Sequence, residues 1–433
     1  MGNTVPPLSP EEFASRFAEI HPALGPQAAK VEATRCLFCF DAPCTLACPT
    51  HIDVPRFIKK IATGNLRGSA NTILASNILG LSCSRVCPVD VLCEGACVMH
   101  GYNKQPIEIG RLQRHAMDYF YSHNPSLPVA KAHASGRVAC IGAGPASLAC
   151  AAELRRRGYS VTIIDKNPLA GGLNTYGIAE YKLRPSDSKK EVDLVRGVGV
   201  EFRLGVEAVP ESLEMEFDAI FLGVGLGSTH NLRIPGENLP GVVDALSFIA
   251  QYKTASIPVG RRVAVIGAGN TAVDAATAAR RLGAKQVFMV YRRGESEMPA
   301  FDYEFELAKL DRIEFHWWSL PVKIHGKDSV ESIECVRLDA NLAPILNSNF
   351  QIPCDMVIPS IGQTRLVEFL SRCRGVELRS GCVVVNPETG QTANPKYFAG
   401  GDCVNGGREV VDAVAMGKRA GAGIARKLEA NHG

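Results

Sequence analysis

Hydrophobic residues recur at helical spacing in the first part of the chain. Apolar positions three and four apart run through residues 11–20, 54–64 and 65–79, which predicts amphipathic helices. We therefore expect an α-helical domain at the N-terminal end. The segment 122–136 that follows is rich in Pro, Ser and His and is predicted to be a linker.

Beyond residue 136 the pattern changes to short apolar runs that alternate with alanine-rich segments. Residues 137–165 and 261–293 each contain an apolar run, a glycine-rich turn, an alanine-rich segment and a second apolar run. This order predicts a strand–helix–strand unit, and its repetition indicates an internal duplication. We expect an α/β fold, with the α-helical domain followed by two Rossmann-like domains that are doubly wound on parallel sheets.

The first glycine-rich turn has the spacing of a dinucleotide-binding site. Gly142 permits a tight turn after the strand, and Gly144 lets the backbone approach a pyrophosphate at the N-terminus of the next helix. Ser147 takes the third position and is small enough for the helix to pack on the strand. Asp165 ends the second strand twenty-three residues after Gly142, where its carboxylate can accept hydrogen bonds from a ribose.

Later motifs favour FAD as the ligand of this first domain. They resemble the flavin domain of disulfide-reductase-type flavoproteins, and the residues that carry the resemblance are Gly172, Leu173, Gly225, Gly401, Asp402 and Val410. The resemblance implies that Asp402 holds the ribityl chain of FAD. It also implies that the helix starting at Val410 faces the flavin pyrimidine ring, where the positive helix end stabilises negative charge.

The second glycine-rich turn lies between the two flavin segments, where this class of flavoprotein carries its nicotinamide domain. Its residues are Gly267, Gly269, Asn270 and Thr271. Arg292 and Arg293 stand where a ribose-binding acid would follow the second strand. Because arginine pairs well with a 2′-phosphate, they favour NADPH over NADH. The turn at Gly362 resembles the one that approaches the nicotinamide.

These motifs divide the chain into three parts. We expect the helical domain at 1–125 and an NAD(P)-binding domain at 256–383. The FAD-binding domain is split between 136–255 and 384–433. The nicotinamide domain is then an insertion in the flavin domain.

Composition excludes several classes of function. The net charge is only +3 over 433 residues, which gives no support to a nucleic-acid or acidic-membrane partner. No apolar run reaches the length of a membrane span, and the first residues lack the basic start and apolar core of a secretory signal. We therefore expect a cytoplasmic protein, in a reducing compartment that disfavours disulfides.

Eight of the fifteen cysteines lie between Cys36 and Cys97. Disulfides, zinc and iron–sulfur clusters are the three candidate explanations. Zinc sites usually use two separated cysteine pairs, whereas the first run, Cys36-x2-Cys39-x4-Cys44-x3-Cys48-Pro49, ends in Cys-Pro like bacterial ferredoxin runs. Beside a flavin and a nicotinamide site, two [4Fe-4S] clusters fit the chemistry best. A non-catalytic zinc-bearing adaptor is the alternative from another functional class.

The same region resembles the dihydropyrimidine dehydrogenase family, and above all its bacterial flavoprotein subunits of the PreT type. RCLFCFDAPC, CPTHID, GLSCSRVCP, LCEGAC and IEIGRLQ carry the resemblance. It implies one cluster on Cys36, Cys39, Cys44 and Cys97, and a second on Cys48, Cys87, Cys93 and Gln113. Cys83 is then a bystander, although spacing alone favours it over Gln113. Lys182 stands where relatives carry an arginine near the flavin.

The resemblance also implies a function. NAD(P)H would reduce FAD, and the clusters would carry single electrons to a partner chain, so no side chain need act as acid or base. The expected partner is an FMN-containing dihydropyrimidine dehydrogenase catalytic subunit of the PreA type, in a hetero-oligomer that reduces uracil or thymine. Glutamate synthase small subunits share the plan, so an NADPH oxidoreductase that feeds another acceptor is the alternative.

Overall fold

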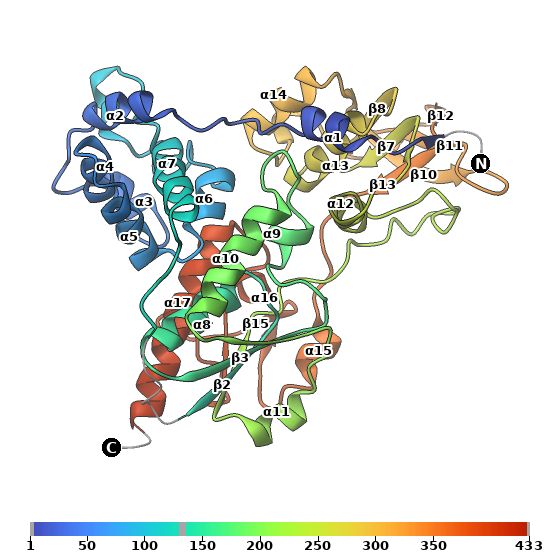
Figure 1. The fold of residues 1–433 in the computed structure, drawn as a ribbon. Coiled ribbons are helices and arrows are strands. Elements are labelled where there is room, and N and C mark those ends of the chain that lie inside the picture. Colours follow the sequence, from blue (N-terminus) through green and yellow to red (C-terminus); the bar gives the residue numbers. More distant parts are fainter. Residues whose placement is uncertain (1–3, 130–135, 431–433) are drawn as a thin grey trace. The chain divides into compact units, whose positions relative to one another are not determined.

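The computed structural model describes residues 4–129 and 136–430, which form two compact units (Figure 1). One unit contains the described parts of 21–175, 182–226 and 365–433. The other contains those of 1–20, 176–181 and 227–364. Residues 130–135 of the predicted linker lie outside the described residues.

The first unit begins with a group of short helices. They are α2 (Pro26–Thr34), α3 (Pro43–Ala47), α4 (Val54–Ala62), α5 (Leu66–Ser76), α6 (Gly80–Val86), the 3-10 helix η1 (Val98–Tyr102) and α7 (Ile109–Ser122). Asp53 and Asn65 cap α4 and α5 by accepting hydrogen bonds from Arg56 N and Gly68 N. The predicted helices at 54–64 and 65–79 are therefore present, and each buries its apolar stripe.

A five-stranded parallel sheet follows in the same unit. Its strand order is β16-β5-β2-β3-β4, with β2 (Arg137–Ile141), β3 (Ser160–Asp165), β4 (Glu201–Leu204), β5 (Ala219–Leu222) and β16 (Tyr397–Ala399). The strands of the second sequence segment thus join those of the first, because β16 pairs with β5. The helices around this sheet are α8 (Pro145–Arg156), α9 (Leu173–Tyr176), α10 (Pro185–Gly197), α11 (Pro210–Glu216), α15 (Val367–Ser371), α16 (Asp402–Asn405) and α17 (Val410–Ala430).

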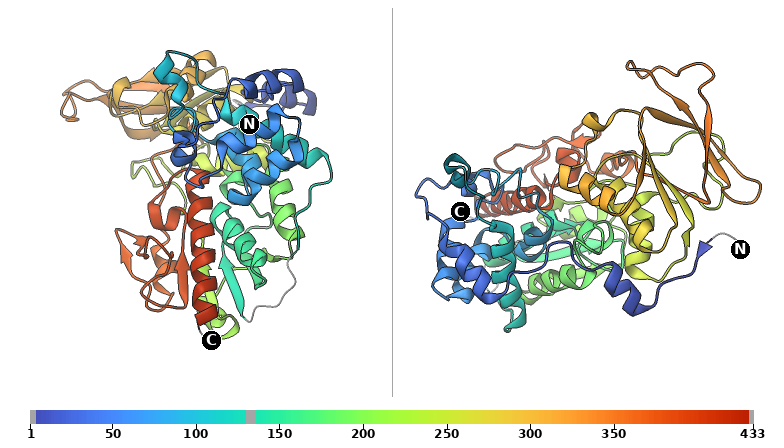
Figure 2. Two further views of the ribbon diagram at one scale, coloured as in Figure 1. Left: turned by 90° about the vertical axis from the view of Figure 1, so that its left-hand side faces the viewer. Right: turned by 90° about the horizontal axis from the view of Figure 1, so that it is seen from above.

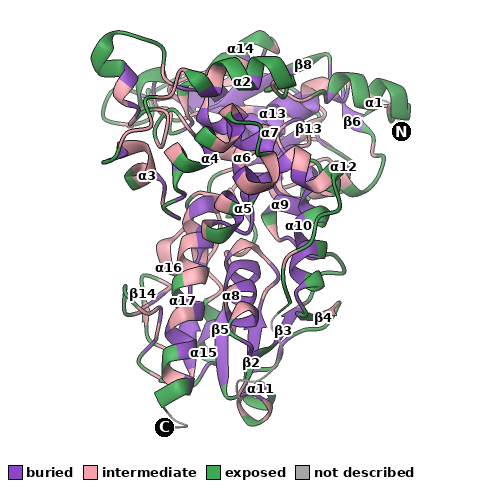
Figure 3. Cartoon of the chain, turned by 60° about the vertical axis from the view of Figure 1, so that its left-hand side comes forward, coloured by how far each residue is buried: buried purple, intermediate pink, exposed green. Residues whose placement is uncertain are grey.

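Helix α17 packs closely on α8, and Figure 2 shows it as the long red helix beside the sheet. A Cβ atom on Gly417 would lie 2.0 Å from the carbonyl oxygen of Ala146, so only glycine allows this approach. Figure 3 shows that α8 and strands β2, β3 and β5 are mostly buried. A hairpin of β14 (Leu378–Arg379) and β15 (Cys382–Val383) completes the unit.

The other unit is built on a four-stranded parallel sheet of order β13-β7-β8-β9. Its strands are β7 (Arg262–Ile266), β8 (Gln286–Val290), β9 (Glu314–His316) and β13 (Met356–Pro359). Helices α1 (Pro10–Arg16), α12 (Ala245–Thr254), α13 (Asn270–Arg281) and α14 (Asp302–Leu310) and the 3-10 helix η2 (Glu295–Glu297) belong to it, and β1 (Thr4–Val5) pairs with β6 (Val259–Gly260).

An antiparallel sheet of β10 (Ser319–His325), β11 (Ser332–Arg337) and β12 (Phe350–Pro353) adds to this unit and was not predicted. The expected fold class is confirmed, because helices at the N-terminal end precede two nucleotide-binding-type parallel sheets. No helix among residues 4–129 and 136–430 combines the length and apolarity that crossing a membrane requires.

Candidate cofactor-binding sites

Four parallel strands of the first unit end at one edge of their sheet. Gly142 follows β2, Asp165 ends β3, Gly223 follows β5 and Gly401 follows β16. Gly142 has φ +90°, and a Cβ atom there would lie 2.5 Å from the carbonyl oxygen of Gly223. The tight turn predicted at Gly142 therefore requires glycine. Ligands of open parallel sheets bind at this carboxyl edge.

The Asp165 carboxylate fixes the first glycine-rich turn. One oxygen accepts a hydrogen bond from Ala143 N at 2.7 Å, and the other accepts one from Asn167 N at 2.7 Å. Each carboxylate oxygen has a second lone pair, so both remain able to accept from a ribose hydroxyl. Asp165 thus stabilises the glycine-rich turn after β2 and lies at the carboxyl edge of the sheet.

The N-terminus of α8 lies beneath a second glycine segment. Gly144 is the N-cap residue, and a Cβ atom on Gly172 would lie 2.8 Å from Gly144 Cα. The backbone at Gly172 therefore lies against the backbone at Gly144, at the helix end that a pyrophosphate would approach. Ser147 is fully buried against the backbone of Gly223, which agrees with a role in helix–strand packing.

The remaining flavin-site candidates lie on neighbouring turns or further along the chain. Asp402 begins α16 directly after Gly401, and its carboxylate accepts a hydrogen bond from Arg408 N at 3.2 Å. Burial raises the pKa of Asp402 above its usual value. Leu173 starts α9 and Gly225 has φ +67°. Val410 starts α17 as expected, and Lys182 is half-buried.

The second unit brings its candidates to the carboxyl edge of its own sheet. Gly267 follows β7 with φ +131°, and a Cβ atom there would lie 2.2 Å from Ser360 O. Gly269 caps α13, whose first residues are Asn270 and Thr271. The side-chain oxygen Oδ1 of Asn270 accepts a hydrogen bond from Phe301 N at 3.1 Å. Thr271 is exposed.

Two arginines follow the adjacent strand β8 at this same edge. Arg293 lies 3.7 Å from Glu297 in an ion pair with both side chains about half exposed. Arg292 is exposed, and no ion pair is recorded for it within the described ranges. Gly362, with φ +91°, follows β13, which pairs with β7. The arginine that is better placed to meet a free anion is therefore Arg292.

Four of the eight N-terminal cysteines line one small cavity. They are Cys36, Cys39, Cys44 and Cys97, and the rest of the lining is mostly apolar and includes Val54, Ile58, Met99, Ile107 and Ile109. Burial, together with the neighbouring Cys36 and Cys97 thiols, raises the pKa of Cys44 to about 11. Soft sulfur donors in an apolar setting fit an iron–sulfur cluster. Binding of its iron would displace the thiol protons of these cysteines.

A second group of cysteines surrounds Cys87. A hydrogen bond with Cys83 raises the pKa of Cys87, as do burial and the neighbouring Cys93 and Cys48 thiols. Burial also raises the pKa of Cys93. The side chain of Gln113 is buried, and its Nε2 donates to Gly80 O at 2.8 Å. Its Oε1 is then the atom that could serve as a ligand.

No group of three or more His, Cys, Asp or Glu side chains suited to holding a metal ion occurs in the described part of the chain. A [4Fe-4S] cluster differs from such a site, because its ligands surround a multi-iron core rather than one ion.

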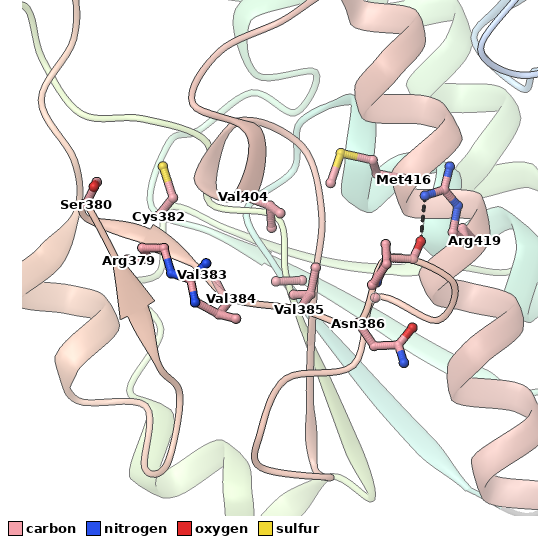
Figure 4. A pocket seen from close by; sticks show the side chains of 13 residues that line it. Arg379, Ser380, Cys382, Val383, Val384, Val385, Asn386, Val404, Met416 and Arg419 are labelled. Carbon is pink, nitrogen blue, oxygen red and sulfur yellow. Dashed lines mark hydrogen bonds between the residues drawn. The ribbon is translucent and has the colours of Figure 1, made fainter.

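Sequence reasoning missed two features of this unit. A cavity of about 500 Å³ lies between the segment around Cys382 and helix α17, and none of the predicted site residues lines it. Figure 4 shows the valine and methionine side chains that line it and the hydrogen bond from Arg419 to Pro387 O, which is 2.7 Å long. The other feature is a set of buried charges that joins α6 to α10. Neither has a local sequence signal, because each combines residues from distant segments.

Comparison with known families agrees with this arrangement. Residues 13–125 match the family described as dihydropyrimidine dehydrogenase domain II, 4Fe-4S cluster. Residues 136–417, more than half of the chain, match the pyridine nucleotide-disulphide oxidoreductases. The chain belongs to the pyridine nucleotide-disulphide oxidoreductase family. This member of the family is an oxidoreductase with a 4Fe-4S domain and FAD- and NADP-binding domains.

Several relatives span most of this family member. The glutamate synthase [NADPH] small chain of Halomonas elongata is 36% identical over 96% of this chain and 94% of the relative. That of Escherichia coli K12 is 34% identical over 98% and 97%. The NADP(+)-dependent formate dehydrogenase subunit beta of Moorella thermoacetica is 33% identical, over 89% of this chain and 60% of its own.

Solved structures share the fold of this family member. The thioredoxin reductase of T. acidophilum has a TM-score of 0.55 at 21% identity, and the match covers 68% of this chain and 99% of that chain. Mycobacterium tuberculosis FprA in complex with NADPH has a TM-score of 0.55 at 19% identity, with 68% and 86% covered. At these identities the likeness concerns the fold alone.

Proposed function

We propose that this chain is the electron-input subunit of a larger reductase. When bound, FAD would supply the two-electron acceptor for NAD(P)H, and two [4Fe-4S] clusters would supply one-electron carriers toward a partner chain. The observation that carries the proposal is the cavity lined by Cys36, Cys39, Cys44 and Cys97, in the same compact unit as the glycine-turn edge. The chain's own residues bind and orient the cofactors and need not exchange protons with a substrate.

We assign the cofactors to the residues predicted from the sequence. The first cysteine group holds one cluster, and Cys48, Cys87, Cys93 and Gln113 hold the other. The edge around Gly142 and Asp165 binds FAD, and the edge around Gly267 and Arg292 binds the nicotinamide nucleotide. The domain boundaries at residues 125, 255 and 383 belong to the same proposal.

The acceptor that we propose is an FMN-containing partner of the PreA type, which reduces uracil or thymine to the 5,6-dihydropyrimidine. The family described for residues 13–125 supports this choice, because its description names dihydropyrimidine dehydrogenase. A glutamate synthase large chain is the second candidate. Two relatives named as glutamate synthase small chains support it, since they align over 94% and 97% of their own lengths.

Isolation of the native complex tests the acceptor. Affinity purification under anaerobic conditions should yield this chain with one large FMN-containing subunit, and uracil or thymine should accelerate NAD(P)H oxidation. Glutamine together with 2-oxoglutarate serves as the competing substrate pair. A complex that oxidises NADPH only with that pair contradicts the pyrimidine acceptor and supports the glutamate synthase one. A complex without iron contradicts the electron-input function itself.

The nucleotide preference gives a prediction for Arg292. Arg292→Ala should raise the KM for NADPH roughly tenfold and leave the KM for NADH unchanged, because about 1.5 kcal/mol of charge-assisted hydrogen bonding to the 2′-phosphate is lost. Steady-state ferricyanide reduction with each nucleotide measures both constants. Arg261, exposed before the amino end of β7, provides the control variant Arg261→Ala. An equal loss with both nucleotides would contradict phosphate recognition.

The identity of the eighth cluster ligand gives a second prediction. Gln113→Ala should lower the iron content below the roughly eight atoms expected for two four-iron clusters, whereas Cys83→Ala should retain them. The reason is that Cys83 already donates or accepts a hydrogen bond with Cys87, while the Gln113 carbonyl oxygen can turn to iron. Iron assays and electron paramagnetic resonance on anaerobically purified variants measure the difference. The reverse pattern would make Cys83 the ligand.

A further inference from the structure

Helix α6 is held by a buried carboxylate from helix α10. Glu191 is 1% exposed. Its Oε1 accepts hydrogen bonds from Leu81 N at 2.8 Å and Ser82 N at 3.0 Å, and its Oε2 accepts one from the Ser82 hydroxyl. The carboxylate therefore binds the backbone donors at the start of α6, which no residue of α6 itself satisfies.

A second buried contact joins the same two helices. Arg85 on α6 lies 3.4 Å from Asp187 on α10, and the two side chains are 6% and 7% exposed. Arg85 also pairs with Asp118 of α7 at 2.6 Å. Two charged contacts one helical turn apart thus fix both the position and the rotation of α6 on α10.

Helix α6 in turn positions candidate ligands of the second cluster. Cys87 is its C-cap residue, with its backbone N bonded to Cys83 O at 3.1 Å. At the other end of the helix, Gly80 O accepts the hydrogen bond from Gln113 Nε2 at 2.8 Å. A displacement of α6 would therefore move Cys87 and release Gln113 together.

We propose that Glu191 is a positioning residue for the second cluster, which sets the place of Cys87 and Gln113 through α6 and adds a buried negative charge at the end of α6 to which Gln113 is bonded. This inference deepens the proposed function and rests on its second cluster. A neutral glutamine could also accept hydrogen bonds from the start of α6, so holding the helix does not by itself require a charge. Burying a carboxylate costs several kcal/mol. The charge makes electron uptake by the cluster less favourable.

The test compares three variants of the full chain, purified with its cofactors. Glu191→Gln removes the charge and keeps the size, and Glu191→Ala removes both. Asp193→Asn is the matched control, because Asp193 lies on the same helix but is 44% exposed and pairs with Lys189 and Arg196 of that helix. Iron and flavin contents and redox titrations followed by electron paramagnetic resonance are the measurements. The signal that Cys93→Ala removes identifies the second cluster.

At pH 8.5, above the value of about 7 to which burial raises the pKa of Glu191, the carboxylate is ionised in the wild type. Glu191→Gln should then shift the reduction equilibrium of the second cluster about tenfold toward the reduced form, or ~59 mV for one electron. The first cluster should keep its potential. Glu191→Ala should also lower occupancy of the second cluster, and Asp193→Asn should change neither.

Results on the variants or on the wild type can contradict the inference or its basis. If Glu191→Gln leaves both potentials unchanged, or shifts both equally, the charge of Glu191 does not act on the second cluster, and if Glu191→Ala keeps full occupancy of that cluster, Glu191 does not position it. If Glu191→Ala fails to fold, the potentials of Glu191→Gln decide. If the wild type itself contains fewer than two clusters, the proposed function fails before the variants are compared.

Discussion

Replacing Cys97 with alanine should remove about half of the iron from the purified protein and leave FAD bound. Cys97 lines the same cavity as Cys36, Cys39 and Cys44, although more than fifty residues separate it from them in sequence. A four-iron cluster that loses one of its four thiolates is no longer fully ligated and should be lost on purification. Iron and flavin assays on anaerobically prepared protein measure the result, about four iron atoms per flavin.

Cys382 supplies the control for this prediction. It is half-buried in the β14–β15 hairpin, distant in sequence from both cysteine groups. Cys382→Ala should keep the full iron content. Full iron in Cys97→Ala would show that the cavity holds no cluster, and loss of all iron would show that the two cysteine groups do not load independently.

Replacing Asp165 with alanine should weaken FAD binding by roughly a hundredfold, or about 3 kcal/mol. The carboxylate holds Ala143 N and Asn167 N at 2.7 Å each, so its loss frees the turn that would bind the pyrophosphate. It also removes the acceptor proposed for the ribose hydroxyls. Equilibrium titration of the deflavinated protein with FAD, followed by flavin fluorescence, measures the affinity.

A second aspartate, directly before β5 of the same sheet, gives a matched control. Asp218 accepts a hydrogen bond from Arg137 N at 2.7 Å, at the opposite, amino end of β2. Asp218→Asn should therefore bind FAD as the wild type does. Affinity within about twofold of the wild type in Asp165→Ala would overturn the proposed role of this edge, because one charge-assisted hydrogen bond is worth more than that.

Much of the fold followed from local patterns. The two glycine-rich turns were predicted from spacing, and the structure gives Gly142 and Gly267 the positive φ angles of +90° and +131° that such turns need. The helices at 54–64 and 65–79 were predicted from apolar spacing and appear with side-chain caps. The antiparallel sheet β10–β12 was not predicted, because its strands have no glycine motif and irregular alternation.

Some features of the candidate sites were likewise predicted from the sequence, and others came only from the structure. Spacing indicated that the N-terminal cysteines act together, but it did not assign them to groups, and the grouping came from family resemblance. The structure gathers Cys97 with Cys36, Cys39 and Cys44 around a cavity. It also places Cys83 in contact with Cys87. The variants Cys83→Ala and Gln113→Ala test which of the two residues is the eighth cluster ligand.

The sequence by itself determined the turns, the helices and the kinds of cofactor, because a glycine's backbone freedom and an apolar stripe act over a few neighbouring residues. Only the tertiary structure decided that Glu191 reaches the start of α6, 109 residues away in the chain. Nothing in the sequence around Glu191 distinguishes it from a surface acid on an amphipathic helix. Its burial and its partners depend on how α10 packs against α6, which is a property of the whole folded unit.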